Sequence, residues 1–441
     1  MRRTLKLSVV IPAHNEEGSI RETLSTLVET LQRESISYEI VMVDDGSSDK
    51  TDLEVQYFAS RDAGVKLVRN VGRNGFGMAV RAGLENCTGD AVAVMMADRS
   101  DSPEDLVKYY RKLDEGYDCV FGSELNLGRL KTEGVVFVHA DVRSLGDLVA
   151  ISPQPDLIVE CSAEPSAQAG YGGSPEYLIA TNLLGCFNCL ELARRTKADF
   201  IFLSTSRVYP YRMLNGLQFT EQETRFALTA AQELAGASEC GISERFPLEG
   251  ARSLYGMTKL ASELMVEDYA DAYGFRFVID RSGLITGPRQ MGKTDQGVIA
   301  LWMAAHYFRK PLRYIGFGGT GKQVRDFIHV DDICDLALEQ IQNLDSYNGQ
   351  VFNVGGGLAA SLSLLETTRL CEEITGNRID IASDTTTRPA DVRIYVTDSR
   401  KLANVRGWRP KRDARATLTG IFNWIRDEED EIQSVLLQQM S

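Results

Sequence analysis

The chain has 441 residues, more than one hydrophobic core usually serves, so we expect two domains. Its 62 acidic and 48 basic residues give a formal net charge of −14 without a basic stripe, which argues against nucleic acid or an anionic membrane surface as a partner. Because there is neither a signal-like start nor an apolar run of about 18 residues, we expect a cytoplasmic protein without a membrane span.

Four short apolar runs alternate with helical patterns in the first 122 residues. The runs cover residues 8–12, 38–43, 65–68 and 91–96. This alternation predicts an α/β fold, with a parallel sheet and helices on both faces. Asp44, Asp45 and Asp98 follow predicted strands, and the carboxyl ends of parallel strands are where such sheets bind ligands.

Residues 1–122 resemble the nucleotide-binding half of glycosyltransferase family 2, especially its dolichyl-phosphate mannose synthase-like members. The matching residues are Pro12, Asn15, Glu16, Glu17, Asp44, Asp45, Gly46, Ser47 and Asp98. The resemblance implies that Asp44 and Asp45 hold the base and ribose of a sugar nucleotide. It also implies that Asp98 holds a divalent metal, Mg²⁺ or Mn²⁺, on the diphosphate. Met96 replaces the first Asp of the family's D-x-D element, with Asp101 nearby as a substitute ligand, and the family's acceptor half is absent.

The pattern of strands and helices continues from residue 123 to the end. Residues 135–142, 157–163 and 200–209 are predicted strands, and we expect a smaller substrate-binding portion over residues 284–441. Thr205 lies at the end of the third strand, where its hydroxyl could hydrogen-bond an oxygen that undergoes reaction. A hydroxyl in this position is also a common cap or turn former.

Tyr255 and Lys259 lie four residues apart in a predicted helix over residues 253–273, so their side chains share one face. An ammonium beside a phenol favours the phenolate, which makes Tyr255 a candidate general acid and base. A tyrosine and a lysine at this spacing also occur as an ordinary solvent-facing pair. The order Thr205, Tyr255, Lys259 favours a reaction centre.

Three further motifs lie downstream: TGPRQMGKTDQG (286–297), GGTGKQVRDFIHVDD (318–332) and RPADV (388–392). With the Thr205, Tyr255 and Lys259 pattern, they make residues 123–441 similar to the extended short-chain dehydrogenase/reductase superfamily. Within it, the chain resembles the NAD-dependent CDP-paratose (CDP-tyvelose) 2-epimerases. The resemblance implies Rossmann-like parallel sheets and a CDP-deoxyhexose-like substrate.

The resemblance also implies roles for single residues. Thr205, Tyr255 and Lys259 become the catalytic residues, and Tyr255 takes the proton from the sugar C2 hydroxyl while hydride leaves C2 for NAD. Hydride then returns to the other face of the 2-keto sugar. The implied NAD contacts are Asp141, Val142, Asn182 and Lys259. The implied substrate contacts are Asp295, Gln296, Gln323, Arg325 and Arg388, the two arginines clamping the diphosphate.

The chain departs from this superfamily before residue 123. The superfamily begins with a unit made of a strand, a G-x-x-G-x-x-G turn and a helix, and this unit is not in its expected place. Such a turn receives the cofactor pyrophosphate, so we expect poor NAD affinity. We also expect the strand over residues 157–163 to lack its neighbour. A strand from the first 122 residues is predicted to fill that slot, with residues 117–121 replacing the lost second strand.

Three functions remain open from the sequence. The first is an NAD-dependent nucleotide-sugar epimerase, and the second is a family 2 glycosyltransferase that uses a divalent metal. The third is an inactive fusion that only binds sugar nucleotides through Arg325 and Arg388. A homodimer through helices over residues 182–195 and 258–273 is a further expectation.

Overall fold

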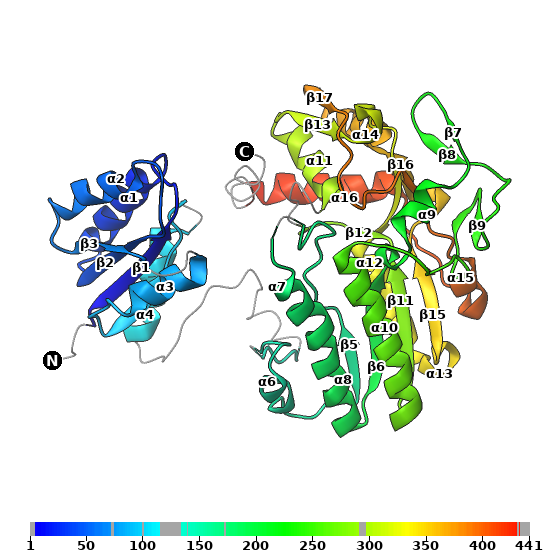
Figure 1. Cartoon of the computed structure of the whole chain (residues 1–441), viewed down its shortest axis with the longest axis horizontal. Helices are drawn as coiled ribbons and strands as arrows, with labels where there is room; N and C mark the ends of the chain where they lie inside the picture. The colour runs from blue at the N-terminus through cyan, green and yellow to red at the C-terminus, as the bar shows by residue number, and fades with distance from the viewer. Residues whose placement is uncertain are drawn as a thin grey trace. The chain divides into compact units, whose positions relative to one another are not determined.

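The computed structural model describes residues 5–71, 75–98, 101–114, 134–138, 140–171, 173–290, 297–429 and 432. The chain divides into two compact units, Met1–Phe137 (unit 1) and Val138–Ser441 (unit 2) (Figure 1). The domain boundary predicted between residues 122 and 123 lies outside the described residues. No helix in the described ranges has the length and apolar character needed to cross a membrane.

Unit 1 is built on a parallel sheet with the strand order β3-β2-β1-β4. Its strands are β1 (Leu7–Ala13), β2 (Tyr38–Asp44), β3 (Val65–Arg69) and β4 (Ala91–Val94). Its helices are α1 (Ile20–Arg33), α2 (Thr51–Ala59), α3 (Phe76–Leu84) and α4 (Pro103–Asp114). Helices α1, α2 and α4 pack on one face and α3 on the other, so β1 is buried along its whole length. A strand covered on both faces reads as an unbroken apolar run, which is why the sequence predicted it.

Unit 2 contains a second parallel sheet, in the order β15-β11-β6-β5. Its strands are β5 (Leu157–Glu160), β6 (Asp199–Thr205), β11 (Phe277–Ser282) and β15 (Gln350–Val354). One face packs against α6 (Leu145–Val149), α8 (Gly185–Thr196) and α10 (Leu254–Tyr273). The other packs against α12 (Val330–Gln342), α13 (Leu344–Tyr347) and α15 (Arg400–Arg406) (Figure 1). The predicted Rossmann-like arrangement is confirmed.

A smaller portion of unit 2 carries its own core. Its strands are β12 (Leu284–Thr286), β13 (Leu312–Ile315), β14 (Val324–His329), β16 (Ser361–Ser363), β17 (Ile381–Asp384) and β18 (Ile394–Tyr395), and its helices are α11 (Val298–Tyr307), α14 (Leu364–Thr375) and α16 (Ala414–Asp427). The remaining elements of unit 2 are α7 (Glu176–Ile179), the π-helix η1 (Ala180–Leu184), the 3₁₀ turns η2 (Ser206–Val208), η3 (Phe317–Gly319) and η4 (Leu358–Ala360), α9 (Tyr211–Asn215), β7 (Phe219–Glu221), β8 (Phe226–Leu228), β9 (Ala237–Ser238) and β10 (Gly241–Ile242).

Two expectations about the start of unit 2 are wrong. Residues 135–138 and 140–142 are irregular or in a turn instead of forming a strand. Strands β1–β4 pair with one another in a separate sheet, so none of them fills the slot beside β5. Residues 117–121, which were predicted to replace the lost second strand, lie outside the described residues. As far as the structure describes the chain, the outer edge of β5 has no partner strand. A strand needs a neighbour for its backbone hydrogen bonds, and the apolar run at 135–138 finds none.

Asp280 is a charged side chain in the core of unit 2, on β11. Gln340 Nε2 of α12 donates a hydrogen bond of 2.9 Å to its carboxylate. Burial raises the pKa of Asp280 from its ordinary value of 3.8 to about 7, against the smaller opposing effect of that hydrogen bond. Because the folded-state pKa is the higher one, the stability contributed by the protonated carboxyl is present below about pH 4 and is lost as the pH rises through about 7.

We therefore predict that Asp280→Asn stabilises unit 2 relative to the wild type, and that this gain grows by about 2 kcal/mol between pH 5 and pH 8. Urea unfolding monitored by tryptophan fluorescence measures the free energy of unfolding of unit 2 alone. The three tryptophans of the sequence, Trp302, Trp408 and Trp424, all lie in unit 2. Asp271→Asn, at an exposed position of α10, is the control. If Asp280→Asn stabilises unit 2 equally at both pH values, the raised pKa of Asp280 is contradicted.

Candidate functional site

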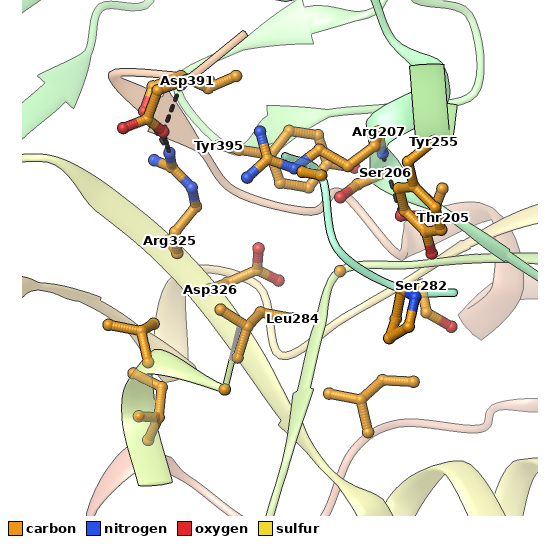
Figure 2. Close-up of a pocket in the computed structure, with 18 of the residues that line it drawn as sticks. Thr205, Ser206, Arg207, Tyr255, Ser282, Leu284, Arg325, Asp326, Asp391 and Tyr395 are labelled. Carbon is orange, nitrogen blue, oxygen red and sulfur yellow. Dashed lines mark hydrogen bonds and ion pairs between the residues drawn. The ribbon is translucent and has the colours of Figure 1, made fainter. Parts of the chain in front are cut away.

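A cavity of about 490 Å³ lies in unit 2, between the carboxyl ends of β6 and β11 and the smaller portion. Its lining residues come from β6, η2, the start of α10, β14 and residues 388–392. Figure 2 shows Thr205 and Tyr255 together on one side of it, Arg325 with Asp391 on the other, and Arg207 extending between them. A concave site with a few converging polar groups is the usual form of a small-molecule site.

The three predicted catalytic residues all line this cavity. Thr205 is the last residue of β6, and its Oγ1 accepts a hydrogen bond of 3.2 Å from the backbone N–H of Arg207. Tyr255 lies in the first turn of α10, which Ser253 caps by accepting a 3.1 Å hydrogen bond from the N–H of Gly256. One turn later Lys259 is buried, and its Nζ donates to the carbonyl of Leu203 at 3.0 Å.

Gly256 allows the start of α10 to approach the turn after β6. A Cβ at this position would lie 2.1 Å from the carbonyl oxygen of Arg207. Only a residue without a side chain permits this approach between helix and turn. The glycine that follows Tyr255 therefore brings the phenol and the Thr205 hydroxyl to the same end of the cavity.

Lys259 has an acidic neighbour that the sequence analysis missed. Glu160, the last residue of β5, places Oε2 3.7 Å from Lys259 Nζ, and both side chains are buried. The ammonium also lies 4.5 Å from the ring centroid of Phe202. The available signal was an acidic residue that ends an otherwise apolar strand, which is unusual unless the charge is paired.

Guanidinium groups also line the cavity, and Arg325 lies on the side opposite Thr205 and Tyr255 (Figure 2). Arg325 and Arg388 were predicted there, and Arg207 and Arg313 join them. Burial, together with nearby Arg207, lowers the pKa of Arg325 to about 10, while Asp391 acts in the opposite direction. Arg325 Nη2 donates to Asp391 Oδ1 at 2.9 Å and stays protonated at neutral pH. Several cations around one space suit an anionic ligand.

The cavity carboxylates within the described ranges are Asp326 and Asp391. Asp326 accepts hydrogen bonds from the N–H groups of Gly357 at 3.0 Å and Thr397 at 3.1 Å. Burial raises the pKa of Asp326 to about 6, against these hydrogen bonds. Asp391 is paired with Arg325. Both carboxylates are therefore held by the protein itself.

The remaining predicted residues of unit 2 fall into three groups. Gln323 lines the cavity and donates from Nε2 to the carbonyl of Ile315 at 3.1 Å. Asp295 and Gln296 lie outside the described residues. Asp141, Val142 and Asn182 do not line this cavity.

The three residues predicted to contact NAD besides Lys259 have partners within the protein. Asp141 forms an ion pair of 2.6 Å with Arg143, and the carbonyl of Val142 accepts a 2.8 Å hydrogen bond from Asn188. The Asn182 amide bonds the backbone of Glu164 through both of its polar atoms. Their roles toward a cofactor stay predictions.

The predicted acidic residues of unit 1 lie at the carboxyl ends of β2 and β4. Asp44 accepts a 3.0 Å hydrogen bond from the N–H of Ser47. Asp45 accepts from Asn70 Nδ2 at 2.6 Å and from the N–H of Gly75 at 2.7 Å. Among the residues that the structure describes, no group of three or more His, Cys, Asp or Glu side chains is arranged to hold a metal, so Asp98 stands without a described ligand set.

Comparison with known proteins follows this division of the chain. Residues 106–355, more than half of the chain, match the model of the NAD dependent epimerase/dehydratase family. The chain belongs to that family. Residues 8–125 match glycosyl transferase family 2.

Among curated relatives, CDP-paratose 2-epimerase of Salmonella typhi is 29% identical over 331 residues, covering 71% of this chain and 93% of that protein. The dTDP-glucose 4,6-dehydratase of Streptomyces antibioticus is 26% identical over 297 residues, covering 66% of this chain and 77% of that protein. A dolichol-phosphate mannosyltransferase of Pyrococcus furiosus is 36% identical over 119 residues, 27% of this chain and 33% of that protein. The transferase-like unit thus spans about a third of that transferase.

Solved structures support the fold. The UDP-glucose 4-epimerase of Thermus thermophilus in complex with NAD aligns with a TM-score of 0.54 at 18% identity, over 95% of this chain and 99% of that chain. The Thermotoga maritima UDP-glucose 4-epimerase with UDP-glucose aligns with a TM-score of 0.55 at 18% identity, over 96% of this chain and 99% of that chain.

The described residues fit one half of NAD. Thr205, Tyr255 and Lys259 all line the cavity, and the family resemblance predicts that they face the nicotinamide end of the cofactor. The pyrophosphate end needs a glycine-rich turn between a strand and a helix N-terminus, beside the strand that β5 represents. No described strand lies there. The groups for chemistry are present, and the cradle for the pyrophosphate is not among the described residues of unit 2.

We predict that Gly256→Ala moves α10 away from η2 and lowers the free energy of unfolding of unit 2 by about 1–3 kcal/mol, because the added methyl overlaps the Arg207 carbonyl. Urea unfolding monitored by tryptophan fluorescence measures this loss. The matched control is Gly77→Ala in α3, where an added Cβ meets nothing within 4 Å; circular dichroism should show unit 1 unchanged or slightly more stable. Equal unit 2 stability in Gly256→Ala and the wild type would show that the close approach is not required.

Proposed function

We propose that unit 2 is an NAD-dependent nucleotide-sugar epimerase that inverts C2 of a CDP-deoxyhexose-like substrate through a transient 2-keto sugar. The observation that carries this proposal is that Thr205, Tyr255 and Lys259 line one cavity, in which Arg325 lies on the side opposite Thr205 and Tyr255. The likeness to CDP-paratose 2-epimerase over most of that protein's length supports the choice of cytosine as the nucleotide base and of C2 as the sugar carbon that is inverted.

The side chains at the reactive end divide the proton transfer between them. The Tyr255 phenol oxygen takes the proton of the sugar hydroxyl and returns it, and Thr205 hydrogen-bonds the same sugar oxygen. We assign Lys259, one helical turn from Tyr255 in α10, to contact with the bound NAD. NAD, when bound, supplies the removal and return of hydride, so the reaction consumes no net oxidant.

The arginines at the other end orient the substrate. A diphosphate carries negative oxygens that planar guanidinium groups bind in pairs, and we assign this role to Arg325 and Arg388. Arg207 lies between Arg325 and Thr205 in Figure 2, so a diphosphate held by Arg325 leaves its sugar pointing toward Thr205 and Tyr255. Gln323, two residues before Arg325, is assigned to the nucleotide beyond the diphosphate.

The cavity favours epimerisation over dehydration. Eliminating water from a keto sugar requires an acid and a base beside the carbons that lose the hydroxyl and the proton. Asp326 and Asp391, the carboxylates in the described lining, are held by backbone N–H groups and by Arg325. Neither is free for such a step.

We predict that Tyr255→Phe lowers the rate of epimerisation by about 10²- to 10⁴-fold, because the proton acceptor is removed. The assay incubates the full chain with NAD and a CDP-deoxyhexose and follows the C2 epimer by NMR. Tyr273→Phe, at an exposed tyrosine of the same helix, is the control and should keep full activity.

Binding measurements distinguish the remaining outcomes. Calorimetric titration of CDP-deoxyhexose should give the same affinity for Tyr255→Phe and the wild type. Full activity of Tyr255→Phe would refute the proposed role. Binding of the CDP-sugar without binding of NAD, together with no product, would support an inactive fusion that only binds sugar nucleotides.

The second candidate is a family 2 glycosyltransferase in unit 1, favoured by the match of residues 8–125 and by the strand-end positions of Asp44 and Asp45. It would use a sugar nucleotide and Mg²⁺ or Mn²⁺ at Asp98. Metal-dependent binding of a sugar nucleotide that Asp45→Asn or Asp98→Asn abolishes would support it. Binding independent of metal and of these residues would count against it.

We further propose that the chain forms a homodimer through α8 and α10. Leu264 and Tyr273 of α10 are 57% and 53% exposed, and Leu184 and Phe187, at the start of the neighbouring helix, are 52% and 38% exposed. Large exposed apolar side chains on adjacent helices commonly mark an interface. Light scattering should give twice the chain mass for the wild type and the single-chain mass for Leu264→Glu. A monomeric wild type would refute the dimer.

A further inference from the structure

The charge of Lys259 is partly satisfied inside the protein. Its ammonium donates to the Leu203 carbonyl and lies 3.7 Å from Glu160 Oε2. The side chains are each 3% exposed, so water screens this ion pair little. A carboxylate and an ammonium this close attract each other strongly in a buried setting.

The Glu160 carboxylate is fixed in place. Its Oε1 accepts hydrogen bonds from the backbone N–H of Ser162, at 2.8 Å, and from the Ser162 hydroxyl. Its Oε2 is buried and accepts no hydrogen bond. A buried carboxylate oxygen without a donor is costly, and the attraction of Lys259 offsets that cost. Glu160 therefore faces Lys259 through its unsatisfied oxygen.

We infer that Glu160 acts as an internal counter-ion that occupies Lys259 and opposes binding of NAD. This inference rests on the proposed function, in which Lys259 contacts the cofactor. Glu160 ends β5, and among the described residues no strand pairs with the outer edge of β5, where the family fold places the strand before its pyrophosphate turn. The Glu160 carboxylate draws the ammonium toward β5 and away from a ligand in the cavity.

The roles of Glu160 and the missing turn are separable. Loss of the glycine-rich turn removes favourable contacts, which no point substitution restores. The Glu160 charge is an added unfavourable interaction, and a neutral side chain of similar size removes it. Glu160 is thus a positioning residue that acts through Lys259, since it does not line the cavity itself.

The test is a calorimetric titration of NAD into the full chain. Glu160→Gln should bind NAD on the order of five- to tenfold more tightly than the wild type, because one nearby unit charge is removed. Glu164→Gln, a carboxylate on the same loop whose Oε1 accepts from the N–H of Ser166, is the matched control and should leave the affinity unchanged. Glu160→Met is a second uncharged variant in case Glu160→Gln does not fold.

A double-mutant cycle distinguishes a charge effect from a general structural one. In a Lys259→Met background there is no ammonium for Glu160 to occupy, so Glu160→Gln should no longer change NAD affinity. The same gain in both backgrounds would overturn the proposed action through Lys259. NAD binding by Glu160→Gln that is equal to or weaker than that of the wild type, or absent in all variants, would overturn the inference.

Titration of the CDP-deoxyhexose on the same samples reports on the proposed function independently. Its affinity should be the same for the wild type and Glu160→Gln. Failure to bind the sugar nucleotide would count against the function whatever the result with NAD.

Discussion

The buried ion pair between Arg281 and Glu263 holds together the elements that build the cavity. Arg281 Nη2 on β11 lies 2.7 Å from Glu263 Oε2 on α10, and both side chains are almost wholly buried. Glu263 also accepts from the Ser204 hydroxyl on β6. Removing one partner of such a pair leaves an uncompensated charge in the core, which typically costs about 3–5 kcal/mol. The helix that carries Tyr255 and Lys259 is thereby fastened to the strand that carries Thr205.

The same network extends to the last strand of the sheet. Arg281 Nη1 donates to the Tyr209 hydroxyl at 3.3 Å, and that hydroxyl donates to Asn353 Oδ1 on β15 at 2.7 Å. Tyr209 also lines the cavity. Polar groups buried with their partners satisfied resist displacement, because any movement leaves one of them unpaired. The reactive end of the cavity is therefore rigid from β6 to β15.

The described residues of unit 2 include the groups proposed for the substrate but not a turn for the pyrophosphate of NAD. The groups proposed to handle the proton and the substrate diphosphate come from β6, α10, β14 and residues 388–392, all inside unit 2. In Rossmann-like folds the first strand and turn hold the cofactor pyrophosphate, and here residues 8–125 match a transferase family. Among the described residues, no strand pairs with the outer edge of β5, and Glu160 ends this strand.

Local patterns were enough to predict much of the molecule. The buried runs of β1 and β2 and the helix with Tyr255 and Lys259 one turn apart were predicted correctly, because burial on both faces gives an unbroken apolar run and a helix has a regular spacing. The strand predicted over residues 200–209 ends at Thr205, after which a 3₁₀ turn begins. Arg325 and Arg388 were placed in the cavity by their motifs, and the structure brings them there. Asp295 and Gln296 stay predictions.

What the sequence by itself determined was therefore the order of many of the elements and the candidate site residues that they carry. Only the tertiary structure decided that residues 135–138 form no strand, that β1–β4 form their own sheet, and that Glu160 faces Lys259. Each of these outcomes depends on which distant segments become neighbours. A strand exists only when another backbone accepts its hydrogen bonds, and a buried charge is paired only where the fold brings its partner, so neither can be read from a local pattern.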